Sequence, residues 1–251
     1  MLDLQHVYAV VLTALIFVPL EWVLPARKAP KPDRQRYVTD ILHVIVGGFF
    51  IRVGTVLVLL GLIFYGPVSD AYGLPLWLQL PILIAMRDFG FYWVHRMYHS
   101  VPFLWRFHRI HHSSEHLDWL ASYRLHPLDQ SVHSAIVLAP TVILDFDPMA
   151  VLIVTAIYRW HTILLHSNVR IGFGPLEKVI SAPAFHHWHH ANEEQAHDRN
   201  FGGQLTIWDR MFGTFYDAQT PRPSRYGVDD PPRENFLTHT IEPFLPGKKN
   251  G

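Results

Sequence analysis

The sequence predicts an all-α integral-membrane protein, a helical bundle with a histidine-rich helical cap on its cytoplasmic side. Three features support this fold class: long hydrophobic blocks, a short basic loop between two of them, and clusters of histidine with helical spacing. Hydrophobic residues make up 49% of the 251-residue chain and are concentrated in the blocks. A transmembrane helix needs about 20 predominantly apolar residues, and two of the blocks reach this length.

The first two hydrophobic blocks each carry one charged residue. Residues 7–24 contain only Glu21, near the end of the block, and residues 41–64 contain only Arg52. Buried core helices of a large soluble protein are the alternative, but two well-separated blocks of this length favour a membrane. No basic leader precedes the first block and no small-x-small site follows it, so we do not expect a cleaved signal peptide.

Two further blocks are interrupted. Residues 74–86 are strongly apolar, and the apolar character continues to residue 94. Residues 131–157 are broken by Pro140 and by the Asp-Phe-Asp-Pro sequence of residues 145–148. Because proline interrupts a helix, we expect this block to form a hairpin that enters and leaves the membrane on one side.

The loop between the first two blocks sets the expected orientation. Residues 25–36 contain five lysines and arginines and one acid, and short basic loops stay on the cytoplasmic side. The second block then crosses outward, residues 65–73 form a short outer turn, and the third block returns. All the histidine clusters are therefore expected on the cytoplasmic side.

Composition divides the chain into three regions. Residues 1–87 hold the first spans and their basic loop, residues 88–217 hold the histidine clusters and the hairpin, and residues 218–251 form a Pro-rich charged tail. We expect the tail to wrap the cytoplasmic face or to be partly disordered. Acidic and basic residues balance at 21 each, so no overall basic field would attract nucleic acid. The absence of cysteine excludes disulfides, thiolate zinc sites and iron–sulfur clusters within the chain.

The histidines form three clusters: residues 95–99 read His-Arg-Met-Tyr-His, residues 108–112 read His-Arg-Ile-His-His, and residues 186–190 read His-His-Trp-His-His. Side chains three and four positions apart share one face of a helix. Each cluster is therefore expected to offer two or three imidazoles to a single point in space. Neutral imidazole is a common ligand of transition metals, and eight of them exceed what one tetrahedral metal needs. The clusters predict two metals side by side.

The clusters do not fit a zinc protease. The HExxH motif requires Glu after the first histidine, and Arg96, Arg109 and His187 stand there instead. Imidazole suits zinc, copper, iron and nickel alike, so the ligands do not identify the metal. Redox-active iron could activate dioxygen toward a C–H bond, whereas zinc could only polarise or hydrolyse. A site at the ends of membrane helices favours oxidation of a lipid, which can enter sideways from the bilayer.

Seven segments resemble the fatty acid hydroxylase / sterol desaturase superfamily, in order and with family-like spacing. They are residues 88–99, 105–114, 124–127, 166–168, 185–190, 200–203 and 208–214. The resemblance implies a membrane-bound, non-haem di-iron oxidoreductase that hydroxylates or desaturates a sterol-like or fatty-acyl lipid. The sequences around residues 112–115 and 124–128 are more similar to the sterol desaturase-like branch.

The resemblance also implies a set of metal ligands. These are His95, His99, His108, His111, His112, His186, His189 and His190, with His166 as a further ligand. Four other residues are candidates for a ligand or for a group that orients one: His126, His161, Asp88 and Asn168. We expect Asp88 to accept a hydrogen bond from a ligand imidazole, two helical turns before His95. The other histidines receive no metal role, and replacing His239 is expected to change nothing measurable.

The expected cofactors are two iron ions, with zinc able to replace them in overexpressed protein, and dioxygen is the expected co-substrate. The expected partners are a bilayer lipid and an external electron donor (a ferredoxin, or a b-type cytochrome with its reductase), because the chain carries no appended haem-binding domain. Two alternatives remain open: a b-type cytochrome, and a membrane metal-binding or transport protein without oxygenase activity. A haem absorption band would indicate the first, and a lack of lipid-stimulated oxygen consumption would indicate the second.

Overall fold

The computed structural model describes residues 4–28, 33–63, 73–218 and 220–245. These residues form helices and loops, with isolated β-bridges and no β-strand, so the all-helical prediction is confirmed. The α-helices are α1 (Leu4–Val23), α2 (Arg34–Leu42), α3 (Gly48–Ile63), α4 (Leu76–Ser100), α5 (Pro102–His112), α6 (Pro127–Ile143), α7 (Pro148–His166), α8 (Pro183–His189), α9 (Ile207–Phe212) and α10 (Phe236–Ile241). Shorter helical turns are η1 (His43–Gly47), η3 (Trp119–Tyr123), η4 (Gly174–Lys178), η5 (Glu194–Ala196) and η6 (Glu242–Phe244).

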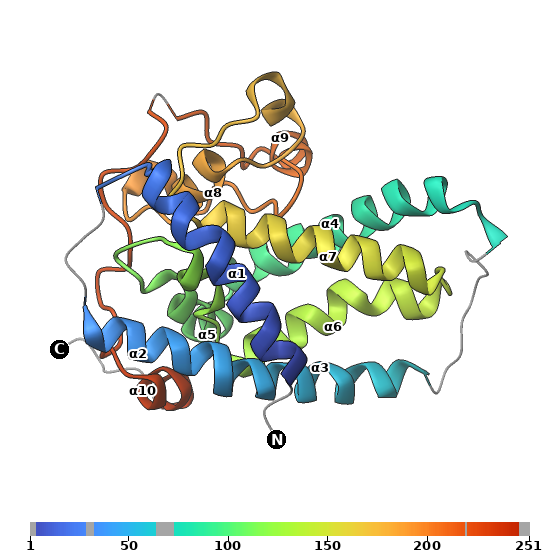
Figure 1. Cartoon of the computed structure of the whole chain (residues 1–251), viewed down its shortest axis with the longest axis horizontal. Helices are drawn as coiled ribbons and strands as arrows, with labels where there is room; N and C mark the ends of the chain where they lie inside the picture. Colours follow the sequence, from blue (N-terminus) through green and yellow to red (C-terminus); the bar gives the residue numbers. More distant parts are fainter. Residues whose placement is uncertain (1–3, 29–32, 64–72, 219, 246–251) are drawn as a thin grey trace.

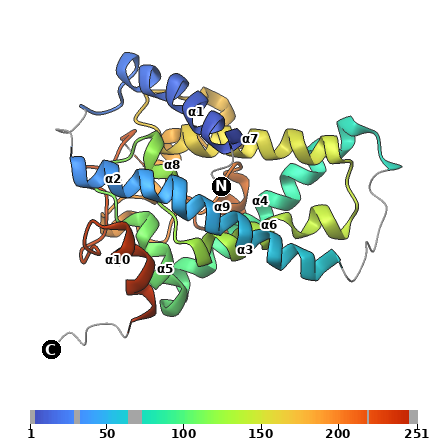
Figure 2. The same cartoon turned by 60° about the horizontal axis from the view of Figure 1, so that its bottom comes forward.

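The long helices and the short ones lie at opposite ends of the molecule. α3, α4, α6 and α7 extend toward one end, and α1 crosses them diagonally (Figure 1). α3 and α4 both pack against α6, and α7 packs against α4. α5, α8, α9 and α10 gather with the long loops at the other end, and Figure 2 shows α10 beside α2 there. The histidine clusters lie on α4, α5 and α8, where the two ends meet.

Proline fixes where several helices begin. Pro102, Pro127, Pro148 and Pro183 each stand in the first turn of a helix, where the missing N–H costs no hydrogen bond. The side chain of Asp147 caps α7 by accepting a hydrogen bond from Met149 N (2.7 Å). The predicted break within residues 131–157 is thus present, because α6 ends at Ile143 and α7 starts at Pro148.

Among the described residues, two helices are long and apolar enough to cross a membrane: Arg34–Gly61, which runs through α2 and η1 into α3, and Pro148–His166, which is α7. Only 17% and 22% of their apolar windows are buried, whereas the core helix of a soluble protein would be mostly buried. Exposed Trp22 and Leu57 lie on α1 and α3, which indicates membrane association. α4 is long enough to cross a membrane but is not apolar enough, because Arg87 and Asp88 interrupt its apolar run.

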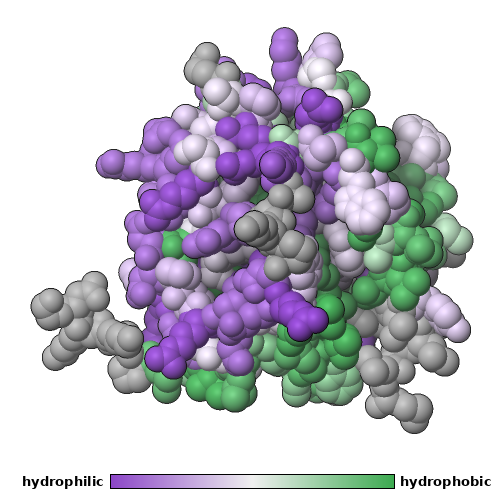
Figure 3. Space-filling model, turned by 60° about the vertical axis from the view of Figure 1, so that its left-hand side comes forward, coloured by the Kyte–Doolittle hydropathy of each residue, from purple (hydrophilic) through white to green (hydrophobic). Residues whose placement is uncertain are grey.

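Hydrophilic and hydrophobic side chains are separated on the surface. The end that carries the short helices is mostly hydrophilic, and hydrophobic side chains gather along its lower and right-hand margins (Figure 3). The predicted outer turn, residues 65–73, lies outside the described residues except for Gly73.

Candidate metal centre

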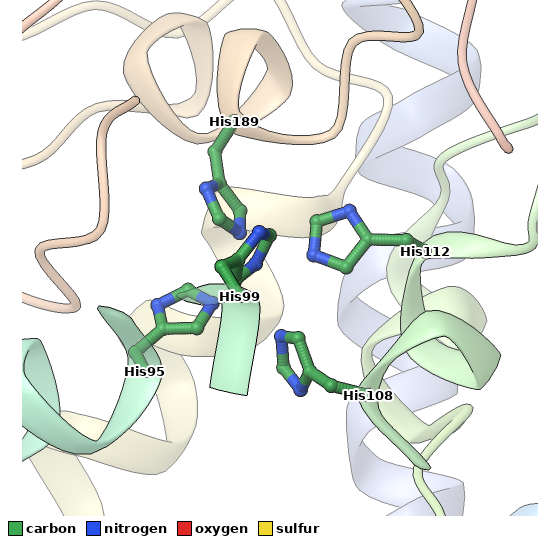
Figure 4. A group of neighbouring side chains, drawn as sticks. All are labelled: His95, His99, His108, His112 and His189. Carbon is green, nitrogen blue, oxygen red and sulfur yellow. The ribbon is translucent and has the colours of Figure 1, made fainter. Parts of the chain in front are cut away.

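The nine histidines predicted as metal ligands come together in two adjoining sets. Within each set, one nitrogen from every ring lies within 4.8 Å of the others. The first set, shown in Figure 4, has its rings pointing toward one another and consists of His95, His99, His108, His112 and His189. The second set consists of His111, His166, His186 and His190. The rings of His112 and His190 are stacked 4.3 Å apart between centroids, so the two sets lie side by side.

Helical geometry divides two of the three clusters between the sets. Successive residues turn by about 100° around an α-helix, so positions i and i+4 lie about 40° apart, whereas i+3 lies about 60° to the other side. On α5, His108 and His112 accordingly face the first set and His111 faces the second. In the third cluster, His186 on α8 and His190, which caps the end of α8, face the second set, and His189 faces the first. Each cluster thus offers two imidazoles to one set, as expected, but the remaining histidine of the second and third clusters joins the other set, which was not predicted.

Five of the rings are oriented through Nδ1. A carbonyl or carboxylate oxygen can only accept, so each of these rings carries its proton on Nδ1 and turns the Nε2 lone pair inward. The acceptors are Phe201 O for His95 (2.8 Å), Asp129 Oδ2 for His108 (3.0 Å), Arg199 O for His189 (2.9 Å), Arg124 O for His111 (3.2 Å) and Thr162 O for His166 (2.8 Å).

The inward nitrogens need a cation. In the second set, Nε2 of His166 lies 3.1 Å from Nε2 of His111, although both rings carry their proton on Nδ1. Two lone pairs therefore face each other, an arrangement that is repulsive unless a cation lies between them. A tetrahedral metal with bonds of 2.0–2.1 Å separates its nitrogen ligands by about 3.3 Å, close to this spacing.

The first set also requires a cation, as its unpaired nitrogens show. Nε2 of His99, His108, His112 and His189 is buried and has no hydrogen-bond partner among the described residues. Buried polar atoms are nearly always paired, so four unpaired ones facing one point fit a metal ion. Burial also lowers the pKa of His112, His186 and His190 well below its ordinary value, and that of His189 to about 3. The rings are thus neutral near pH 7, as metal ligands must be.

One loop supplies two of the orienting carbonyls. Residues 199–205 carry the carbonyls of Arg199 and Phe201, and two buried carboxylates hold this loop in place. Asp209 accepts from the backbone N–H groups of Phe201 (2.8 Å) and Gly202 (2.7 Å). A Cβ at Gly202 would lie 2.3 Å from the Leu205 carbonyl oxygen, so this tight turn requires glycine.

Asp88 is the second of these carboxylates, and its predicted hydrogen bond from a ligand imidazole is absent from the described structure. It accepts instead from the backbone of Gln204 (2.6 Å) and Leu205 (2.9 Å), and from the side chains of Tyr158 and Trp208. Asp88 therefore acts on the histidines only through the loop.

Asp129 and Arg124 orient rings from outside this loop, and neither of them was assigned this role from the sequence. Asp129 holds His108 through its carboxylate, and Arg124 holds His111 through its carbonyl. The Arg124 side chain is fully buried and is itself fixed by Asp40 (2.8 Å) and Glu234 (2.8 Å). These partners lie 84 and 110 residues away in sequence, so no local pattern could reveal them.

His126, His161 and Asn168 lie outside both sets. His126 caps α6 by accepting from Leu128 N (3.1 Å), and its other nitrogen donates to Thr240 O (3.0 Å). The two nitrogens of His161 contact Gln204 and Ser181. The Asn168 amide pairs with the backbone of Arg27, which ties the basic loop to the chain two residues after His166.

Four further histidines are buried without belonging to a set: His43, His133, His187 and His239. His187 donates from Nε2 to Ser167 O (3.1 Å) and accepts from the Tyr226 hydroxyl (2.6 Å). His239 is completely buried and donates from Nδ1 to His43 Nε2 (3.1 Å). The expectation that His239 is dispensable does not fit this burial, because its loss would leave Nε2 of His43 buried without a partner.

Comparison with known proteins identifies the family. The model of the fatty acid hydroxylase family matches residues 80–214, which include every histidine of both sets, and the chain belongs to this family.

Among the relatives, the ornithine lipid hydroxylase OlsE of Rhizobium tropici is 31% identical over 68% of this chain and 51% of its own length. Human alkylglycerol monooxygenase is 33% identical over 64% of this chain and 33% of its own. A probable Δ(7)-sterol 5(6)-desaturase of Neurospora crassa is 30% identical over 55% of this chain and 38% of its own. The chain thus spans from a third to half the length of these relatives. No solved structure matches it significantly.

Proposed function

We propose that this protein is a membrane-bound di-iron oxygenase that hydroxylates or desaturates a C–H bond of a lipid, using dioxygen and electrons from an external donor. The observation that carries the proposal is the pair of adjoining, buried histidine sets with Nε2 lone pairs turned inward. The names of the relatives, which include a hydroxylase, a monooxygenase and a desaturase of lipids, support oxidation of a lipid.

Each set would hold one metal ion. Two redox-active irons bound there would supply the oxidising power that dioxygen chemistry on an unactivated C–H bond requires. Hydroxylation consumes O2, two electrons and two protons, and converts C–H into C–OH with release of one water. Desaturation consumes the same reactants, removes two hydrogens from adjacent carbons and releases two waters. The two electrons come from a ferredoxin or a b-type cytochrome with its reductase.

The residues of the chain contribute orientation and exclusion of water. Asp129 and the carbonyls of Phe201, Arg199 and Arg124 fix the rings before any metal binds, so little ordering is left to occur on binding. Burial keeps water from the inward nitrogens of the second set and keeps the imidazoles of both sets neutral.

We place the metal sets on the cytoplasmic side of a multi-pass membrane bundle formed by α1, the joined α2–α3, α4 and the α6–α7 hairpin. The pairing of Asn168 with Arg27 supports this, because it brings the basic loop next to the second set. Cysteines introduced near Ser113 and near Ala191, at the exposed residues Glu115 and Glu194, should label from the same side of sealed vesicles. Labelling from opposite sides would overturn this topology.

The reaction can be tested with the iron-loaded full chain in lipid vesicles, supplied with a ferredoxin and its reductase. Mass spectrometry of the lipids should show one added oxygen atom or two lost hydrogens in one lipid class, together with oxygen consumption. His111→Ala should abolish both signals, whereas His116→Ala, at an exposed histidine outside both sets, should not. Equal activity in these two variants would contradict the proposal.

A further inference from the structure

A pocket of about 390 Å³ opens onto the first histidine set. His99, His112 and His189 line it, and the last two are 4% and 5% exposed with their Nε2 atoms unpartnered among the described residues. The pocket therefore connects the candidate metal position to the surface. Its volume suits the polar end of a lipid rather than a whole acyl chain.

The mouth of the pocket is acidic. Asp198, Asp229 and Asp230 line it, against the single guanidinium of Arg109. Arg109 forms an ion pair with Glu242, and Asp229 forms one with Arg225.

Two of these carboxylates have no cation opposite them. The side chain of Asp230 has no hydrogen bond or ion pair within the part of the chain that the structure describes. Asp198 Oδ1 lies 3.6 Å from Nδ1 of His99, and its side chain is 71% exposed. Two carboxylates at the mouth are thus left to attract a positive charge.

An aromatic ring lies beside the histidines in the same pocket. Trp105 lines the same pocket, with its ring centre 5.0 Å from that of His99 and 5.4 Å from that of His112. The face of a tryptophan ring attracts a cation, most strongly where water is partly excluded. Carboxylates beside an indole form a combination that replaces the hydration of an ammonium group.

We propose that this pocket binds the ammonium group of an amine-bearing lipid. Held by the acidic mouth and Trp105, the ammonium places the neighbouring carbons next to His99, His112 and His189. The oxidised C–H bond then lies close to the headgroup, and the reaction follows the hydroxylation balance given above. This inference rests on the proposed function, which it narrows to one class of substrate.

Binding can be tested apart from turnover with zinc-loaded full-length protein in detergent. The probes are hexylamine and hexanol, which share a chain length and differ in charge at pH 7. Titration calorimetry should show hexylamine binding about tenfold more tightly than hexanol, a typical effect of a partly desolvated ion pair. Equal affinity for the two probes would overturn the proposal, whatever the activity of the enzyme.

Asp230→Asn should reduce the preference for hexylamine to about threefold or less, since it removes one unopposed carboxylate. Asp217→Asn makes the same chemical change at an exposed residue outside the pocket and should leave the preference intact. The zinc content of each variant, measured in the same samples, separates a loss of charge from a loss of folding. An unchanged preference in Asp230→Asn at full zinc content contradicts the inference.

Activity separates this inference from the proposed function. Iron-loaded protein should oxidise an amine-bearing lipid with a higher kcat/KM than its N-acetylated form, in which the positive charge is gone. Equal kcat/KM for the two lipids would reject the headgroup assignment and leave the oxygenase function standing. Oxidation of neither lipid, nor of any lipid in an extract, would reject the function itself.

Discussion

The two histidine sets have the same residue type and similar burial, yet they differ in access. The first set has five rings, and three of them line a pocket open to the surface. The second set has four buried rings, none of which lines that pocket, and its inward nitrogens lie 3.0–3.1 Å apart. In metal sites a closed ligand sphere is typical of a structural role and an open one of a catalytic role. Under the proposed function, we therefore propose that the substrate reaches the first set and that the metal of the second set has a supporting role.

Removal of one ligand from each set is the strongest way to break this comparison. His189→Ala should release the metal of the first set and His111→Ala that of the second, so each variant should retain about one metal per chain by elemental analysis. Both should lose lipid oxidation, because the reaction requires the pair. Loss of both metals in either variant would show that the two sets do not fill independently.

Asp129→Asn should act on the first set alone. The amide cannot replace the carboxylate as a charged acceptor for His108, and loss of such a partner typically weakens metal binding about 10–100-fold. Chelator titrations should show one weakened metal and one unchanged metal. Two equally weakened metals would place Asp129 in the support of both sets.

Gly202→Ala tests the loop that orients His95 and His189. The added Cβ meets the Leu205 carbonyl and Asp209, so the loop must shift, at a cost of about 1–3 kcal/mol of folding stability. The shift should also loosen the first metal more than the second. Gly90→Ala is the matched control, since nothing lies within 4 Å of a Cβ there and α4 continues through it. Gly202→Ala should therefore unfold at a lower temperature and lose more of the first metal than Gly90→Ala does. Equal unfolding temperatures and metal contents in the two variants would contradict this role of the loop.

Outside both sets, His239 is expected to change the pH dependence of stability rather than metal content or activity. Burial lowers the pKa of His239 to about 4, below its value in the unfolded chain, so the unfolded state binds the proton first as the pH falls. This residue's contribution to stability is full above pH 6.5 and is lost as the pH falls toward 4, by at most about 1.4 kcal/mol per pH unit. Denaturant unfolding of metal-loaded protein should therefore depend less on pH in His239→Gln than in the unchanged chain. The same pH dependence in both would remove His239 from this account.

The sequence allowed the helices and the histidines to be predicted, because both depend on local spacing. The i, i+4 pair of His95 and His99 and the helical hairpin broken before Pro148 are of this kind. The division of α5 and α8 between two sets was missed, because the clusters were treated as single faces although His111 and His112 point about 100° apart.

The groups that orient the rings could not be predicted in the same way. Asp129 reaches His108 from 21 residues away, and the Phe201 carbonyl reaches His95 from 106 residues away. Only the tertiary fold brings these atoms together. Asp88 is a contact that was predicted but is not present. Its position two helical turns before His95 indicated a direct hydrogen bond from a ligand ring, whereas in the fold Asp88 accepts from the backbone of the 199–205 loop.

The number of metals per folded chain tests the central claim most directly. Protein expressed with iron, extracted from membranes under conditions that preserve its fold, should contain two metal ions per chain by elemental analysis. Folded protein that holds one metal ion or none, with iron or zinc in excess, would contradict the assignment of two histidine sets to two metals.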